Sequence, residues 1–504
     1  MSTLDAIVAS VRSASPDLVD EWEVIAIVEA AGYSDARVRD EFKLADARAL
    51  GRAVYERLRR ERRPPAPRAT EPGRGRRMRE ALASFAGDFF NSVVYAVPWL
   101  VMFWMQHVRP EVFAVPGELA APLMLAIMGS LVVAGGAVQA IARKGVFYTS
   151  LGERAVAYRV TRKLFDCGAA VAVAAGAMAA AAAWYFSLFP APAIFLALNA
   201  YVTLSVLWMV CALITIEGRR WRVPVVFGLA AGAYLGLSRV GLSTVAAQLG
   251  AAYAALACGG AFAAADRRRV ADPPDAFLPK TRVLVHSLAP YVWYGTLYFA
   301  LLFADRLVGA TARLLGGAAF GVDAAYAQAT DVALVSFLLM AALVEHLNTV
   351  FMRFLRREMT QRTATDARLA RAIGRRHLML LLVVAALFPV IDAICRSVSI
   401  SLRPLAGAPG GWPVLVPASA GYLCLAIGLL NALILLSMNR PFAVVSSFAS
   451  AVIVDVVTGG LAAAVLGAAY AVLGLTLGAA WLALRTTSKV NEMLAWPAHA
   501  YAAL

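Results

Sequence analysis

Residues 119–142 read LAAPLMLAIMGSLVVAGGAVQAIA, and residues 191–216 read APAIFLALNAYVTLSVLWMVCALITI. Neither stretch contains a charged residue. A helix of about twenty apolar residues spans the roughly 30 Å hydrocarbon layer of a bilayer. Hydrophobic residues make up 61% of the whole chain. The sequence therefore predicts an all-α, polytopic membrane protein embedded in a lipid bilayer.

Twelve membrane-spanning helices are predicted. Stretches 222–265 and 441–485 are too long for one crossing, so each is interpreted as a helical hairpin, turning at Gly241 and at Gly459–Gly460. The predicted spans are residues 84–106, 118–142, 164–187, 191–216, 222–240, 243–265, 284–308, 328–352, 376–396, 413–437, 441–460 and 463–485.

Basic residues orient these spans. Of the 47 Lys and Arg residues, 41 lie in the amino-terminal tail, the loops of one side and the carboxyl-terminal end, and six lie on the other side. Lys and Arg accumulate in cytoplasmic loops, so both termini are predicted to be cytoplasmic in a bacterial inner membrane. The net charge of +15 is then explained largely by loops that border anionic lipid. We do not expect a nucleic-acid partner.

Residues 1–62 precede the spans and predict a small cytosolic helical bundle. Gly32 would end one helix and Ser34 would cap the next through its hydroxyl. The segment is interpreted as an interaction module for cytosolic biosynthesis partners, with a DNA-binding helix-turn-helix as the alternative. The predicted helices are Leu4–Val11, Leu18–Ala31, Asp35–Phe42 and Ala45–Arg59.

Residues 63–83 form a linker rich in proline and arginine. Such a composition buries little apolar surface, so a tether is predicted, with its arginines against anionic headgroups.

The spans fall into two similar halves, residues 84–283 and 284–486, followed by a tail at 487–504. In each half a long basic segment joins the second and third spans, Arg143–Lys163 and Arg353–Arg376. In each half a short basic turn joins the fourth and fifth spans. Six-plus-six repetition is a common plan of transporters, with the substrate path between the halves.

Two segments resemble the multidrug/oligosaccharidyl-lipid/polysaccharide flippase superfamily, in particular its branch with the membrane subunit of the Pel exopolysaccharide exporter. The first runs from Ser205-Val-Leu-Trp208 through Glu217-Gly-Arg-Arg220 to Gly228. The second comprises Tyr294-Gly-Thr-Leu-Tyr298, Asp305-Arg306, Tyr326–Leu339 and Val344–Phe354. The resemblance implies a flippase that moves polysaccharide or lipid-linked sugar by alternating access. The soluble module departs from that family.

Ionisable residues inside spans mark candidate pathway positions, because exposing one to lipid is costly. Asp88 and Asn91 share a face of the first span, although Asp88 could instead cap its entry. Glu345 and His346 lie in the eighth span and form either a proton-carrying pair or ordinary packing. Asp455 lies well inside the eleventh span, without an adjacent basic residue. Asp392, one turn before Arg396, is expected to be paired with it.

The seventh span carries two further candidates. Arg306, at its predicted outer end, suits an anionic headgroup or a gate, with an interfacial anchor as the alternative. Tyr291, Tyr294 and Tyr298 follow helical spacing and could stack on sugar rings or simply pack against other helices.

Enzyme motifs are absent from the sequence. It lacks GxxxxGK[ST], HExxH and paired CxxC motifs, and its five cysteines lack metal-ligand spacing. We expect no catalytic residue, cofactor or metal. The rival functions are ion-coupled drug efflux and a non-transporting membrane scaffold or sensor.

Overall fold

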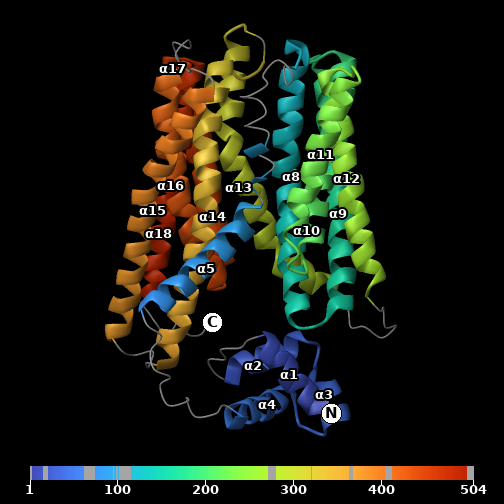
Figure 1. The fold of residues 1–504 in the computed structure, drawn as a ribbon, viewed down its shortest axis with the longest axis vertical. Helices are drawn as coiled ribbons and strands as arrows, with labels where there is room; N and C mark the ends of the chain where they lie inside the picture. Colours follow the sequence, from blue (N-terminus) through green and yellow to red (C-terminus); the bar gives the residue numbers. More distant parts are fainter. Residues whose placement is uncertain are drawn as a thin grey trace.

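The structure is a computed structural model, and within the residues that it describes every regular element is a helix. These are residues 3–14, 21–61, 74–101 except 95, 98 and 99, 115–270, 280–361 except 319, 367–402 and 411–495. Figure 1 shows two helical bundles side by side, with a smaller group of helices at one end. We call that end of the molecule the module-facing end.

Helices occupy the places of the predicted spans, although α5 covers only residues 84–93 of the first one, and residues 102–106 of that span lie outside the described part. The first half contains α5 (Arg74–Val93), α8 (Gly117–Ser150), α9 (Arg154–Tyr185), α10 (Ala191–Ile214), α11 (Arg222–Arg239) and α12 (Thr244–Arg268). The second half contains α13 (Thr281–Leu315), α14 (Ala324–Gln361), α15 (Ala367–Leu402), α16 (Gly411–Ser437), α17 (Pro441–Leu466) and α18 (Val472–Leu494). Ten of them are long and apolar enough to cross a membrane within the described residues; α5 and α11, which carry arginines at their starts, are the exceptions.

Matching helix contacts support the internal repeat. In the first half α8 contacts α9 and α10, and α12 contacts α10 and α11. In the second half α14 contacts α15 and α16, and α18 contacts α16 and α17. Each contact has its counterpart six helices later, so the protein has two halves with one packing plan.

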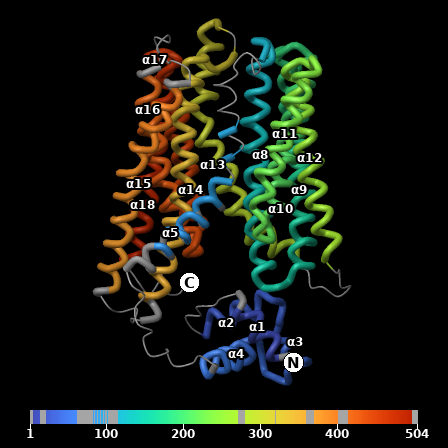
Figure 2. The backbone as a smooth tube through the Cα atoms, viewed as in Figure 1, coloured from blue at the N-terminus to red at the C-terminus, as the bar shows by residue number. Residues whose placement is uncertain are grey.

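The two halves meet through an equivalent pair of contacts. Helix α8 packs on α13, and α5 packs on α14. In their halves α5 and α13 are the first helices, and α8 and α14 are the second. Each contact thus joins the second helix of one half to the first helix of the other, as a twofold relation between the halves requires. Figure 2 shows α5 crossing obliquely between the two bundles.

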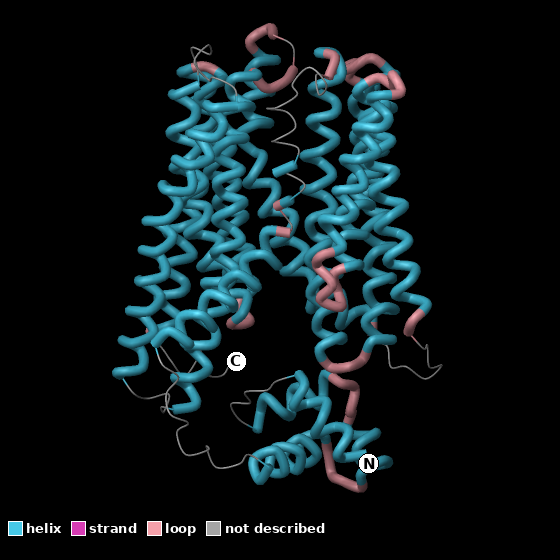
Figure 3. Tube along the Cα trace, viewed as in Figure 1, coloured by secondary structure: helices cyan, strands magenta, loops and turns pink. Residues whose placement is uncertain are grey.

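Four short helices form the predicted amino-terminal module: α1 (Thr3–Ala14), α2 (Glu21–Ala30), α3 (Asp35–Phe42) and α4 (Ala47–Glu61). Their apolar faces share a core that includes Val11, Val28 and Leu50. The amide of Arg37 donates to the Ser34 hydroxyl over 3.4 Å, which confirms the predicted cap. Figure 3 shows these helices at the module-facing end.

The module docks on the turn between α8 and α9. The Ser10 hydroxyl donates to the carbonyl of Leu151 over 3.0 Å. Ile27 packs against the buried cluster that contains Tyr148 and Leu151. The module therefore rests on the first half.

Two predicted boundaries differ from the structure. Helix α5 begins at Arg74, so residues 74–83 of the predicted linker are helical; residues 73–97 contain no proline, and Arg, Met, Ala and Leu favour helix. Residues 62–73 lie outside the described part. Helix α18 extends to Leu494, into the predicted tail.

The predicted turn at Gly459–Gly460 is also wrong. Helix α17 continues to Leu466, and the break falls at Gly467, whose φ is 106°. A short 3₁₀ helix, Ala468–Ala471, leads into α18. Gly459 instead allows close packing, because a β-carbon there would lie 3.0 Å from the carbonyl oxygen of Ala471. The turn at Gly241 is confirmed, with a φ of 89°.

Candidate functional site

A buried polar cluster lies within the second half, between α13 and α14. Asp305 is fully buried and accepts a hydrogen bond from the Tyr326 hydroxyl over 2.6 Å. Arg306 is also buried and forms an ion pair with Asp331, with 2.8 Å between Nη2 and Oδ1. The cluster places two carboxylates, a guanidinium and a phenol in an otherwise apolar bundle.

Arg306 was predicted at the outer end of its span, and this position is wrong. Helix α13 continues to Leu315 rather than ending near residue 308, so Arg306 lies inside the helix and faces protein. An interfacial anchor would be exposed. A buried guanidinium needs a charged partner, and Asp331 supplies one.

Asp455 of α17 lies near this cluster and is fully buried. Its helix packs on α13, the helix that carries Asp305. Neither of its carboxylate oxygens has a hydrogen-bond partner in the part of the chain that the structure describes. Gly474 of α18 makes room for it, because a β-carbon there would lie 2.5 Å from Asp455 Oδ1. Burying a carboxyl without a hydrogen-bond partner is costly, so Asp455 stays a candidate pathway residue.

Glu345 lies at the contact between the two halves. Its Oε1 is 3.7 Å from Nη1 of Arg220, which precedes α11 in the first half. His346, its neighbour on α14, contacts the ring of Phe85 on α5, with 5.1 Å between ring centroids. Both predicted residues therefore touch the first half, Glu345 at the turn before α11 and His346 at α5.

The three predicted tyrosines are packed between helices. Tyr294 and Tyr298 contact the ring of Phe448 on α17, at 5.4 and 6.2 Å between centroids. The guanidinium of Arg143 on α8 lies 4.8 Å from the ring centroid of Tyr291. These contacts agree with the packing interpretation, and a sugar-stacking role stays a prediction.

The remaining candidates are settled in part. Asp88 and Asn91 belong to α5, but their side chains lie outside the described residues. Asp392 is paired with Arg396, as expected, and both also contact the Ser419 hydroxyl.

Two networks of the structure are missing from the sequence-based predictions. Asp266, at the end of α12, binds both Arg219 and Arg222. His377 of α15 makes a 2.7 Å hydrogen bond with the Asn431 side chain, which donates to Thr487 over 2.8 Å. The partners are about fifty residues apart in the chain, so no local spacing pattern could reveal them.

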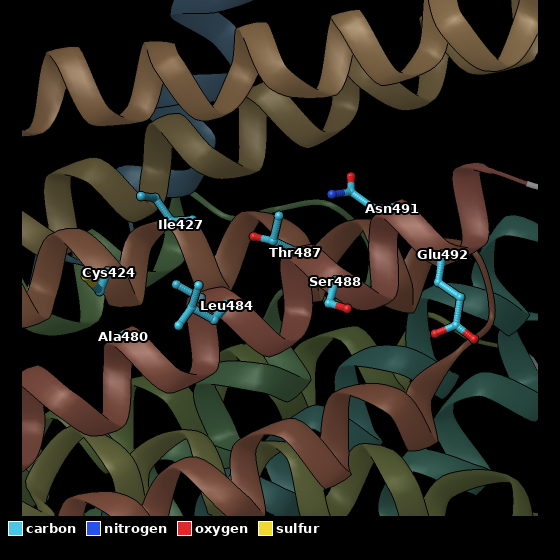
Figure 4. Close-up of a pocket in the computed structure, with 9 residues that line it drawn as sticks. Cys424, Ile427, Ala480, Leu484, Thr487, Ser488, Asn491 and Glu492 are labelled. Atoms are coloured by element: carbon cyan, nitrogen blue, oxygen red, sulfur yellow. The ribbon is translucent and has the colours of Figure 1, made fainter.

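Beside the second network, α16 and α18 enclose a groove of about 900 Å³. Figure 4 shows its lining, with Cys424 and Ile427 from α16 beside Leu484 and Thr487 from α18. One end is apolar, and the other carries Asn491 and Glu492.

No group of three or more His, Cys, Asp or Glu side chains within the described ranges is arranged to hold a metal ion. The polar groups found here form ion pairs, hydrogen bonds and a contact between the halves.

Solved structures of MATE transporters share this arrangement. A MATE in complex with MaD3S matches with a TM-score of 0.56 at 12% identity, over 82% of this chain and 95% of that chain. An inward-facing multidrug resistance MATE family transporter of the MOP superfamily gives 0.50 at 13% identity, over 80% and 94%. An outward-facing one gives 0.51 at 13%, over 82% and 95%. No protein-family model and no curated protein sequence matches the chain.

These likenesses establish the fold. The chain is a multi-pass, all-helical membrane protein with the two-half arrangement of MATE transporters.

Proposed function

We propose that this protein is an alternating-access transporter that moves polysaccharide or lipid-linked sugar across the bacterial inner membrane. One observation carries the transport function: two six-helix halves of one packing plan meet mainly through two equivalent helix pairs, α8 with α13 and α5 with α14, in the described part of the chain. Two rigid bundles joined in this way can rock about their contact, opening a central path to either side in turn.

The sugar-bearing substrate is supported by the flippase-like segments around residues 205–228 and 294–354. The module, resting on the first half, would receive a cytosolic biosynthesis partner.

A reconstitution experiment tests this function. The purified protein is placed in liposomes that contain a fluorescent polyprenyl-pyrophosphate sugar, and dithionite bleaches the label in the outer leaflet. Transport predicts bleaching beyond the half that an empty liposome shows. Bleaching equal to that of protein-free liposomes would contradict a lipid-linked sugar substrate.

A second candidate is ion-coupled efflux of drugs or small molecules. The multidrug transporters of the same fold favour it, together with the unpartnered carboxyl of Asp455. Ethidium accumulation in cells with and without the protein separates the candidates. Lower accumulation that Asp455→Asn abolishes supports efflux, and unchanged accumulation argues against it.

A further inference from the structure

The contact between Arg220 and Glu345 joins the halves at the module-facing side of the molecule. Arg220 belongs to the turn between α10 and α11 of the first half, and Glu345 belongs to α14 of the second. Both side chains are partly exposed, at 35% and 44%. A pair that is accessible to water can break without leaving a buried charge behind.

The turn that carries Arg220 is fixed to its own half. Arg219 Nη1 donates to Asp266 Oδ1 over 2.8 Å, and Arg222 Nη2 donates to the same oxygen over 3.0 Å. Asp266 and Arg222 are buried, at 3% and 5% exposure. Breaking a buried ion pair is strongly unfavourable, so we expect this anchor to persist when the halves move.

Further contacts hold the same turn from the side of α8. The Thr149 hydroxyl donates to the carbonyl of Ile216 over 3.3 Å. Gly145 leaves room for the Ile216 side chain, since a β-carbon there would lie 2.7 Å from it. Gly218, with a φ of 75°, provides the sharp turn that follows.

Arg220 therefore stands between two anchored arginines and reaches across to the other half. We propose that Arg220 and Glu345 form a reversible ionic latch, positioned by Asp266, that holds the two halves together at the module-facing side. The latch closes when the halves approach on that side and opens when they separate. It rests on the alternating access proposed above and adds the residues that bias it.

The buried ion pairs of Asp266 and the exposed pair of Arg220 with Glu345 differ in strength, as their different roles require. The buried anchor keeps the turn in place, whereas an exposed ion pair shifts an equilibrium only about two- to fivefold. A contact of that strength biases a conformational equilibrium without locking it.

Distance measurements between the halves test the latch. The full-length protein, with its native cysteines changed to alanine, is spin-labelled at R162C on α9 and S488C on α18, both exposed positions. Pulsed electron paramagnetic resonance in lipid nanodiscs then gives the distance distribution. Glu345→Gln should raise the ratio of long-distance to short-distance populations about two- to fivefold. The charge exchange R220E/E345R should restore the original ratio.

A matched control comes from Asp323→Asn, which removes an ion pair of similar exposure within the second half, where Arg313 Nη1 is 3.3 Å from Asp323 Oδ2. This variant should leave the distribution unchanged. An unchanged distribution with E345Q, or a charge exchange that fails to restore it, overturns the latch.

The role of Asp266 has its own test. Asp266→Asn should produce the same shift as E345Q although both latch residues are present. If that variant does not fold, Arg219→Gln loosens the anchor from its more exposed side and should give a smaller shift. A normal distribution in a folded variant contradicts the positioning role. The distance measurements contain no substrate, so a failure to transport sugar would not contradict the latch. A single narrow distance between the two labels in all variants would instead contradict alternating access.

Discussion

Gly135 of α8 and Gly295 of α13 face each other across the contact between the halves. A β-carbon on Gly295 would lie 2.3 Å from the carbonyl oxygen of Gly135, and one on Gly135 would lie 2.8 Å from the carbonyl oxygen of Gly295. Small residues let helix backbones approach closely in membranes, where packing rather than the hydrophobic effect drives association. The two halves thus meet, at this point, backbone to backbone.

Gly295→Ala is therefore expected to destabilise the protein by about 1–3 kcal/mol, because the methyl group forces the two helices apart. Thermal unfolding in detergent, followed by intrinsic fluorescence, measures the change. Gly232→Ala on α11 is the control: no atom lies within 4 Å of its β-carbon, so its melting temperature should stay the same or rise. Equal melting temperatures for wild type and G295A would show that the close contact is absent.

The buried Arg306 and the exposed Arg313 lie two turns apart on α13 and differ in setting. Arg306→Ala leaves Asp331 without its partner and should cost about 3–5 kcal/mol, as loss of half a buried ion pair does. Arg313→Ala breaks an exposed pair and should cost less than about 1 kcal/mol. Chemical unfolding of both variants in the same detergent gives the comparison. Similar losses for the two arginines would mean that Arg306 is solvated rather than buried.

Both chain termini are predicted to be cytoplasmic, because the basic loops lie on the side of the module. Alkaline phosphatase fused after Arg63 or after Leu504 should be inactive, and green fluorescent protein at the same places should fluoresce. Phosphatase activity at either end would contradict the twelve-helix topology.

The module is predicted to fold on its own and to be dispensable for insertion, since its core is formed by α1–α4 alone. Deletion of residues 2–75 should leave a protein that is recovered in the membrane fraction.

Ile27→Asp should release the module from the turn at Leu151 and increase its cleavage by trypsin in membranes. Valine at the same place, which keeps the apolar contact, serves as the control; trypsin cleavage equal in both variants would argue against docking.

Much of the fold was accessible from the sequence because the bilayer enforces it. Charge-free stretches such as 191–216 can only be spanning helices, and the long and short loops revealed the repeat. The turn at Gly467 was missed because Gly459–Gly460 carries the same local signal, and only packing against α18 distinguishes the two uses of glycine. The candidate site was harder still. Glu345 stood out as a charge in a span, but its partner Arg220 lies 125 positions earlier and looked like any loop arginine.

The lengths of α8 and α9 have a consequence for the module. At 1.5 Å per residue their 34 and 32 residues extend about 50 Å, well beyond the roughly 30 Å hydrocarbon layer. We therefore expect the turn at Leu151 to lie outside the acyl chains, with the module that binds there held away from the bilayer surface. We expect the module to move with the first half and to be insensitive to lipid composition. A partner that binds the module would then act directly on the proposed movement of that half.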